Sequence, residues 1–150
     1  MLAPVKLILV NAEGFAANGN SNIDALEGNI SALRDYQVEC VAYSRLKSEE
    51  ISSIAEQLGI ILYEAIGTNG DFYFKMREEY SLTDDQIAVI AMSDDDIPFL
   101  KRVKFSAAIQ GAPMKVKAES YFPTYSTGGA VSEIAELILK AKKYHNGWSE

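Results

Sequence analysis

Residues 5–10, Val-Lys-Leu-Ile-Leu-Val, form a nearly continuous apolar run that favours β-structure. A strand that is apolar on both faces suits the middle of a sheet that is covered on both sides, as parallel sheets are. The run ends at the segment Asn11-Ala12-Glu13-Gly14, whose polar residues and glycine indicate a turn. We therefore expect a buried central strand that carries polar side chains at its carboxyl end.

Segments with strand character alternate with segments of helical periodicity along the rest of the chain. The first predicted helix follows a cap at Asp24, and its apolar residues Leu26, Ile30 and Leu33 would share one face. The other predicted strands are residues 39–43, 60–63, 86–92, 105–109 and 120–122, and the other predicted helices are residues 48–58, 71–80, 97–103, 113–117 and 129–143. This alternation predicts an α/β fold, in which a mainly parallel sheet lies between two layers of helices. We expect one domain over residues 1–143 and a C-terminal tail over residues 144–150.

Charge and hydropathy argue against several classes of partner. The chain has 21 acidic and 14 basic residues, and its net charge of −7 would repel nucleic acid and anionic membrane surfaces. We find no apolar stretch of the roughly 18 residues that a membrane span needs, and no secretory leader. Cys40 is the single cysteine, so no internal disulfide is possible. We therefore expect a soluble, cytoplasmic protein.

Polar residues follow several of the predicted strands. They are Asn11 and Glu13 after the first, Ser44 and Arg45 after the second, residues 67–71 after the third, and residues 94–96 after the fourth. Ligands of open parallel sheets bind outside the carboxyl ends of the strands. These residues are therefore the candidates for a site.

Their order and spacing resemble those of the haloacid dehalogenase (HAD) superfamily. The resemblance covers about residues 5–141 and is closest to the capless branch that includes 3-deoxy-D-manno-octulosonate 8-phosphate phosphatase. It implies a three-layer α/β/α, Rossmann-like fold without a cap domain. It also implies Mg²⁺-dependent phosphohydrolase chemistry, and a possible link to sugar-acid metabolism.

The first motif of the family, Asp-x-Asp-Gly, corresponds here to Asn11-Ala12-Glu13-Gly14. In the family the first Asp attacks phosphorus and the second protonates the leaving alcohol. An amide cannot be the anionic nucleophile, so Asn11 removes covalent catalysis at its first step. Glu13 keeps a carboxyl group but places it about one methylene further out, where catalytic geometry suffers.

The phosphate-binding positions of the second and third motifs are only partly kept. Ser44 matches the Ser or Thr that donates a hydrogen bond to the phosphoryl group. The position of the family's lysine falls on Asn69, and Lys75 is the nearest cation, about a helical turn and a half further on. The resemblance thus leaves Ser44, Asn69 and Lys75 as candidate phosphate-binding residues.

The metal motif of the branch corresponds to the acidic segment 93–98, in which two residues of the family pattern are missing. The resemblance implies a metal set of Asn11, Glu13, Asp94 and Asp95, with weak or absent Mg²⁺ binding. Residues 94–96 could equally form a solvated turn that caps the following helix. The β-hairpin with which the branch builds its tetramers has no counterpart beyond the loop 15–23, so that contact is expected to be absent.

These substitutions favour a HAD-like protein with lost or strongly reduced phosphohydrolase activity. It would act by binding a small phosphorylated metabolite or a protein partner. An alternative is an active Mg²⁺-dependent phosphatase of small sugar phosphates, with Glu13 or one of residues 94–96 as the essential carboxylate. A flavodoxin-like or receiver-type domain is a third hypothesis, although the first strand lacks the phosphate loop of flavodoxins.

Overall fold

The computed structural model describes residues 4–12, 23–45, 48–65, 69–109, 112–120, 122–125 and 130–149. Six strands form one sheet in the order β3-β2-β1-β4-β5-β6, and every neighbouring pair is parallel. The strands are β1 (Leu7–Asn11), β2 (Glu39–Ser44), β3 (Leu62–Glu64), β4 (Ile87–Ala91), β5 (Phe105–Ile109) and β6 (Phe122–Tyr125). The predicted parallel sheet is therefore confirmed, with the first strand near its middle.

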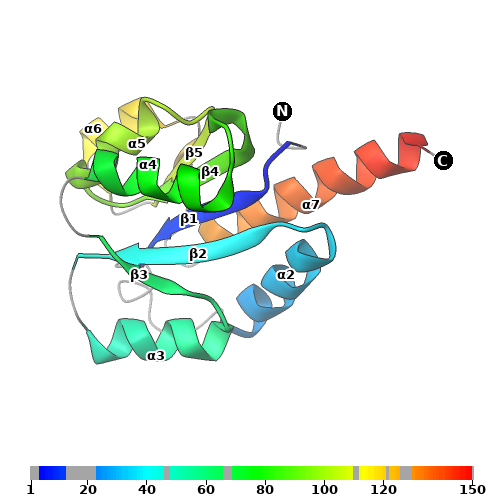
Figure 1. Ribbon diagram of the computed structural model, residues 1–150, viewed down its shortest axis with the longest axis horizontal. Coiled ribbons are helices and arrows are strands. Elements are labelled where there is room, and N and C mark those ends of the chain that lie inside the picture. The colour runs from blue at the N-terminus through cyan, green and yellow to red at the C-terminus, as the bar shows by residue number, and fades with distance from the viewer. Residues whose placement is uncertain are drawn as a thin grey trace.

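Helices cover both faces of this sheet (Figure 1). On one face lie α2 (Ile23–Asp35), α3 (Glu49–Leu58) and α7 (Ala130–Ser149). On the other lie α4 (Asn69–Tyr80), α5 (Ile97–Leu100) and α6 (Met114–Glu119). No helix in the described part of the chain is both long and apolar enough to cross a bilayer.

The central strand β1 explains why two separate cores form. All five of its residues are buried. Because side chains alternate along a strand, Ile8 and Val10 pack with the α2 side, whereas Leu7 and Leu9 pack with the α4 side. The continuous apolar run of the sequence thus fits a strand that is buried on both faces.

The strand order places the carboxyl ends of three strands together. From β1 the chain moves outward through β2 and β3, and it then returns to the other side of β1 as β4. The connections therefore leave the sheet in opposite directions on either side of the boundary between β1 and β4. Such a switch point is where open α/β sheets form their binding crevices.

Local signals set the ends of α3 as the sequence predicts. The Ser48 hydroxyl accepts a hydrogen bond from the Ile51 N–H at 3.4 Å and caps the first turn. Gly59 ends the helix with a φ of +69°, a left-handed conformation that costs little only for glycine.

Several predicted boundaries are wrong. The helix predicted over 97–103 ends at Leu100, and the strand predicted over 120–122 runs from Phe122 to Tyr125. Asp24 lies within α2, which begins at Ile23, so it does not precede the helix as a cap. Helix α7 continues to Ser149, beyond the expected end at residue 143. The segment predicted as a tail contains no proline, and each residue added to a formed helix gains a hydrogen bond. The division into one domain and a tail stays a prediction.

Candidate functional site

The candidate site lies where β1, β2 and β4 end. Asn11 is the last residue of β1, Ser44 is the last residue of β2, and both are buried. After β4 the chain forms the short 3-10 turn η2 (Asp94–Asp96). The predicted candidates from these three segments therefore come to one end of the sheet.

Asp96 is the centre of this region. Its side chain is 0% exposed. Its Oδ2 accepts hydrogen bonds from Asn11 Nδ2 at 2.8 Å, from the Met92 N–H at 2.8 Å and from the Ser93 N–H at 3.1 Å. Its Oδ1 accepts one from the Tyr43 hydroxyl at 2.5 Å. We call Asp96, with these four donors, the Asp96 cluster.

The local sequence explains how the carboxylate reaches this position. Ser93 and Asp96 form a capping box, in which the Asp96 side chain returns to the backbone N–H of Ser93. The Asp96 N–H in turn donates to the Ser93 carbonyl at 3.0 Å and closes the turn. A short sequence motif thus folds one acidic side chain back against the end of β4.

Tyr43 is held in place by aromatic contacts. Its ring centroid lies 5.5 Å from that of Phe72 on α4 and 5.2 Å from that of Phe99 on α5. These tilted and edge-on arrangements are the favoured geometries for aromatic pairs. The ring is therefore fixed in the core, with its hydroxyl directed at Asp96.

The predicted metal residues have different surroundings. Asp94 and Asp95 are exposed, and Asp95 Oδ2 lies 3.7 Å from Arg45 Nε. Glu13 lies outside the described residues. The carboxylate that meets Asn11 is Asp96, which was not in the predicted set. The alternative of a solvated capping turn describes Asp94 and Asp95 well, but it fails for the buried Asp96.

The donor set around Asp96 does not fit Mg²⁺ in this arrangement. Mg²⁺ requires oxygen lone pairs in near-octahedral geometry at about 2.0–2.1 Å. Asn11 turns its amide N–H, not its oxygen, toward Asp96, and the other donors also point hydrogens at the carboxylate. Within the described residues, no three or more His, Cys, Asp or Glu side chains are grouped to hold a metal ion.

The candidate phosphate-binding residues do not come together at one place in the described structure. Ser44 is buried at the end of β2. Asn69 is the first residue of α4, but its side chain lies outside the described part. Lys75 is exposed on the same helix, whose residues Phe72 and Met76 face the core. Lys75 is therefore directed to solvent from the middle of α4.

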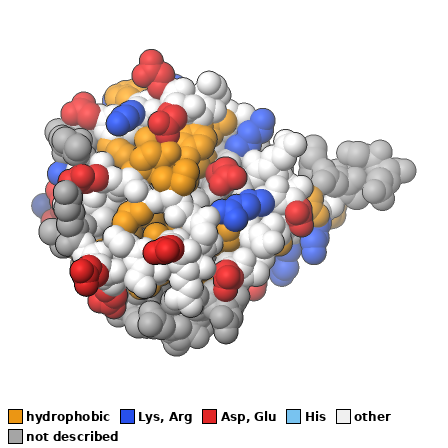
Figure 2. Space-filling model, turned by 60° about the horizontal axis from the view of Figure 1, so that its bottom comes forward, with side chains coloured by type: hydrophobic (Ala, Val, Ile, Leu, Met, Phe, Trp, Pro, Cys, Tyr) orange, Lys and Arg blue, Asp and Glu red, His pale blue; other side chains and the backbone are white. Residues whose placement is uncertain are grey.

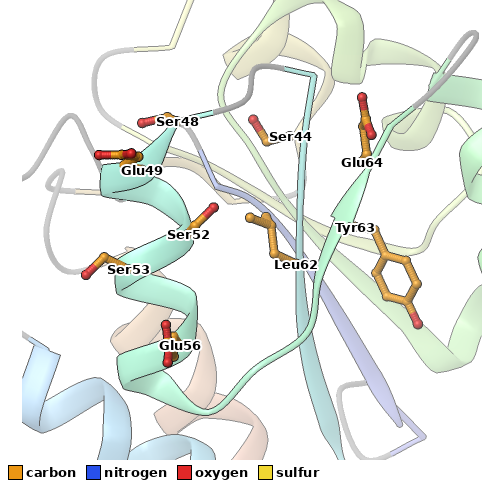
Figure 3. Close-up of a pocket in the computed structure, with 9 residues that line it drawn as sticks. All are labelled: Ser44, Ser48, Glu49, Ser52, Ser53, Glu56, Leu62, Tyr63 and Glu64. Atoms are coloured by element: carbon orange, nitrogen blue, oxygen red, sulfur yellow. The ribbon is translucent and has the colours of Figure 1, made fainter.

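Sequence reasoning missed a hollow of about 540 Å³ between α3 and the strands β2 and β3 (Figure 3). Its lining residues are Ser44, Ser48, Glu49, Ser52, Ser53, Glu56, Leu62, Tyr63 and Glu64. In Figure 3 Ser44, Ser52 and Leu62 point into the hollow. Ser44 thus belongs both to the strand ends and to this hollow.

The hollow is acidic. Among the residues that the structure describes, its lining contains three glutamates and neither lysine nor arginine. Acidic side chains are also spread over the face seen in Figure 2. A phosphate dianion would meet repulsion here, whereas hydroxyl and amino groups would find hydrogen-bond acceptors.

Tyr63 borders this hollow but is engaged elsewhere. Its hydroxyl donates to Glu79 at 2.6 Å and lies 3.0 Å from the Tyr80 hydroxyl. Burial raises the pKa of Tyr63, and the hydrogen bond with Glu79 raises it further. The phenol therefore stays protonated and serves as a link between β3 and α4.

Tyr43 was not singled out from the sequence, and Asp96 was singled out only as one of the candidate residues 94–96. Asp96 carries a usable signal, since Ser93-x-x-Asp96 before an apolar segment has the spacing of a capping box. Tyr43 carries none beyond its place in an apolar strand. Its role depends on β4 lying two strands away from β2.

Comparisons with known proteins identify the fold. No family model and no curated protein sequence matches the chain. Among solved structures, 3-deoxy-D-manno-octulosonate 8-phosphate phosphatase from Yersinia pestis matches with a TM-score of 0.80 and 20% identity, over 95% of this chain and 84% of that chain. The cobalt-bound form of the deoxy-D-mannose-octulosonate 8-phosphate phosphatase from Haemophilus influenzae matches with a TM-score of 0.79 and 20% identity, over 95% of this chain and 91% of that chain.

A third similar structure holds a fuller set of ligands. It is the 3-deoxy-D-manno-octulosonate 8-phosphate phosphatase from Moraxella catarrhalis in complex with magnesium, phosphate and KDO. It matches with a TM-score of 0.82 and 18% identity, over 98% of this chain and 92% of that chain. HAD-superfamily hydrolases are also among the matching structures. At these identities the likeness shows a shared fold, and the predicted HAD-like fold is confirmed.

Proposed function

We propose that this chain is a HAD-fold protein whose phosphohydrolase activity is lost or strongly reduced, and that it acts through binding or assembly. The observation that supports this most directly is the hydrogen bond from Asn11 to Asp96. It places an amide N–H at the end of β1, where the family resemblance implies an anionic nucleophile. The neighbouring carboxylate is engaged by that same amide.

The chemistry of Asn11 argues against covalent catalysis. A neutral amide oxygen is a poor nucleophile toward phosphorus, and a carboxylate such as that of Asp96 is far too weak a base to ionise an amide. Removing the nucleophile of a catalytic unit lowers kcat on the order of a millionfold in well-studied hydrolases. A compensating route would need another carboxylate at the strand ends.

The surroundings of the strand ends support binding over phosphate hydrolysis. The adjoining hollow offers serine hydroxyls and carboxylates, a lining better suited to an uncharged polyol or an amine than to a phosphomonoester. The names of the similar structures suggest sugar-acid metabolism as a setting. A cytoplasmic location is part of the proposal and is supported by the single, buried Cys40.

The alternative is an active Mg²⁺-dependent phosphatase of a small sugar phosphate, with a rearranged site. It would need Glu13 or one of residues 94–96 to act as the essential carboxylate. The bound magnesium and cobalt of the similar structures favour this alternative, since they show that the fold accommodates such ions.

A phosphate-release assay separates the two. The wild-type chain is incubated with millimolar Mg²⁺ and a panel of sugar phosphates, beside the variants Asp96→Asn and Asp94→Asn. We expect no Mg²⁺-dependent release above the enzyme-free blank. Mg²⁺-dependent turnover by the wild type that disappears in a folded Asp94→Asn or Asp96→Asn variant would overturn the proposal.

A further inference from the structure

We infer that Asn11 takes the place of a divalent cation at Asp96, so that the strand ends hold together without a metal and Mg²⁺ does not stabilise the wild-type fold. The inference concerns the same residues as the proposed function, but it is tested by stability and not by turnover. The two can therefore fail separately.

The first step is the charge of Asp96. The residue is fully buried, and an ion without compensation is strongly disfavoured in a protein interior. All four donors of the Asp96 cluster are uncharged groups: an amide, a phenol and two backbone N–H groups. Hydrogen bonds of this kind favour the ionised form of a buried carboxylate.

The second step is the position of the donors in the chain. Asn11 lies 85 residues and Tyr43 lies 53 residues from Asp96 in the sequence. Asn11 belongs to β1 and Tyr43 to β2, whereas Asp96 follows β4. The Asp96 cluster therefore ties together three neighbouring strands at their carboxyl ends, a connection that a shared cation would otherwise provide.

The third step is the exchange of a single atom. Asp is nearly isosteric with Asn, so Asn11→Asp would replace the donating N–H by a second oxygen without changing the packing. That oxygen would face Asp96 Oδ2 at about the distance that the amide now has, 2.8 Å. Two carboxylates this close repel each other when both are ionised, and a divalent cation between them would relieve the repulsion.

The test compares thermal unfolding in EDTA and in millimolar Mg²⁺, followed by far-UV circular dichroism. The wild-type Tm should agree within about 1 °C between the two conditions, because neither state gains from the ion. Asn11→Asp should melt on the order of 10 °C below wild type in EDTA and regain several degrees in Mg²⁺. Asn11→Ala removes the donor without adding charge, so it should lose stability but show no response to Mg²⁺.

A second variant keeps the test decisive if Asn11→Asp does not fold. The double variant Asn11→Asp with Asp96→Asn has one ionisable carboxyl group in place of two, which removes the repulsion, so it should melt above Asn11→Asp in EDTA and ignore Mg²⁺. A wild-type Tm that rises by several degrees with Mg²⁺ would overturn the inference. So would an Asn11→Asp protein that is as stable as wild type in EDTA, or a double variant that is no more stable than the single one.

Discussion

Replacing Asp96 by alanine would remove the acceptor of four donors at once, two of them buried and two half-buried. Each buried donor that loses its partner costs about 1–3 kcal/mol. The variant no longer bears the cost of burying a carboxylate, which offsets part of this sum. The loss of one member of a buried charged cluster typically costs about 3–5 kcal/mol. We therefore expect Asp96→Ala to lower the free energy of unfolding by about 4 kcal/mol, which corresponds to roughly 10 °C in Tm for a chain of this length.

A double-mutant cycle with Tyr43→Phe isolates one contact of the Asp96 cluster. The phenylalanine keeps the ring between Phe72 and Phe99 and removes only the hydroxyl. In the wild-type background it should cost about 2 kcal/mol, the usual value for a hydrogen bond to a charged group. In the Asp96→Ala background the hydroxyl has already lost this acceptor, so the same change should cost close to zero.

Urea unfolding measured by far-UV circular dichroism gives the four free energies of the cycle. The exposed Asp94→Ala serves as the matched control and should stay within about 0.5 kcal/mol of wild type. Additivity of the Asp96 and Tyr43 changes within about 0.5 kcal/mol would refute an energetic link between the two side chains. A cost for Asp96→Ala below about 1 kcal/mol would show that the carboxylate is not the centre of a buried polar cluster.

Two further predictions concern the scaffold. Gly59→Ala should destabilise the chain by about 1 kcal/mol, because Gly59 has a φ of +69°. Gly28→Ala, in the middle of α2 with open space around the added methyl group, should stabilise the chain by up to about 1 kcal/mol. Urea titrations of both variants test the contrast. Burial raises the pKa of the Cys40 thiol from 9.0 to about 12, so at about pH 8 labelling by a thiol reagent should be at least about a thousandfold slower in the folded chain than in urea. Because the pKa of this thiol is higher in the folded chain, the thiol ionises first in the unfolded chain, and the free energy of unfolding should fall as the pH rises from about 9 toward 12. Equal labelling rates in the folded and unfolded chain would contradict the burial of Cys40.

Features determined by local sequence were predictable. The strand Phe105–Ile109 and the caps of α3 at Ser48 and Gly59 depend on residues within a few positions of one another. The polar ends of β1 and β2 were also identified correctly, because the polarity changes sharply at Asn11 and Ser44. The general location of the site therefore follows from the sequence and the rule for parallel sheets.

The choice among the three successive aspartates was only partly predictable, because the capping-box spacing distinguishes Asp96 but does not show that its side chain is buried. Asp94, Asp95 and Asp96 carry the same group, and only the geometry of the 3-10 turn directs the third of them inward. Its contact with Asn11 spans 85 residues, which no local pattern encodes. The hollow beside α3 was missed for a related reason. Its walls come from α3, β2 and β3, and the sequence of none of these elements determines how far apart they pack.

The rim strands of the sheet bear on how this chain could assemble. β3 has three residues and β6 has four, fewer than any strand between them. β6 also contains Pro123, which has no N–H to offer a neighbour, and Glu64 on β3 is an exposed carboxylate. Growth of the sheet by addition of a strand from another molecule is therefore disfavoured at both of these edges.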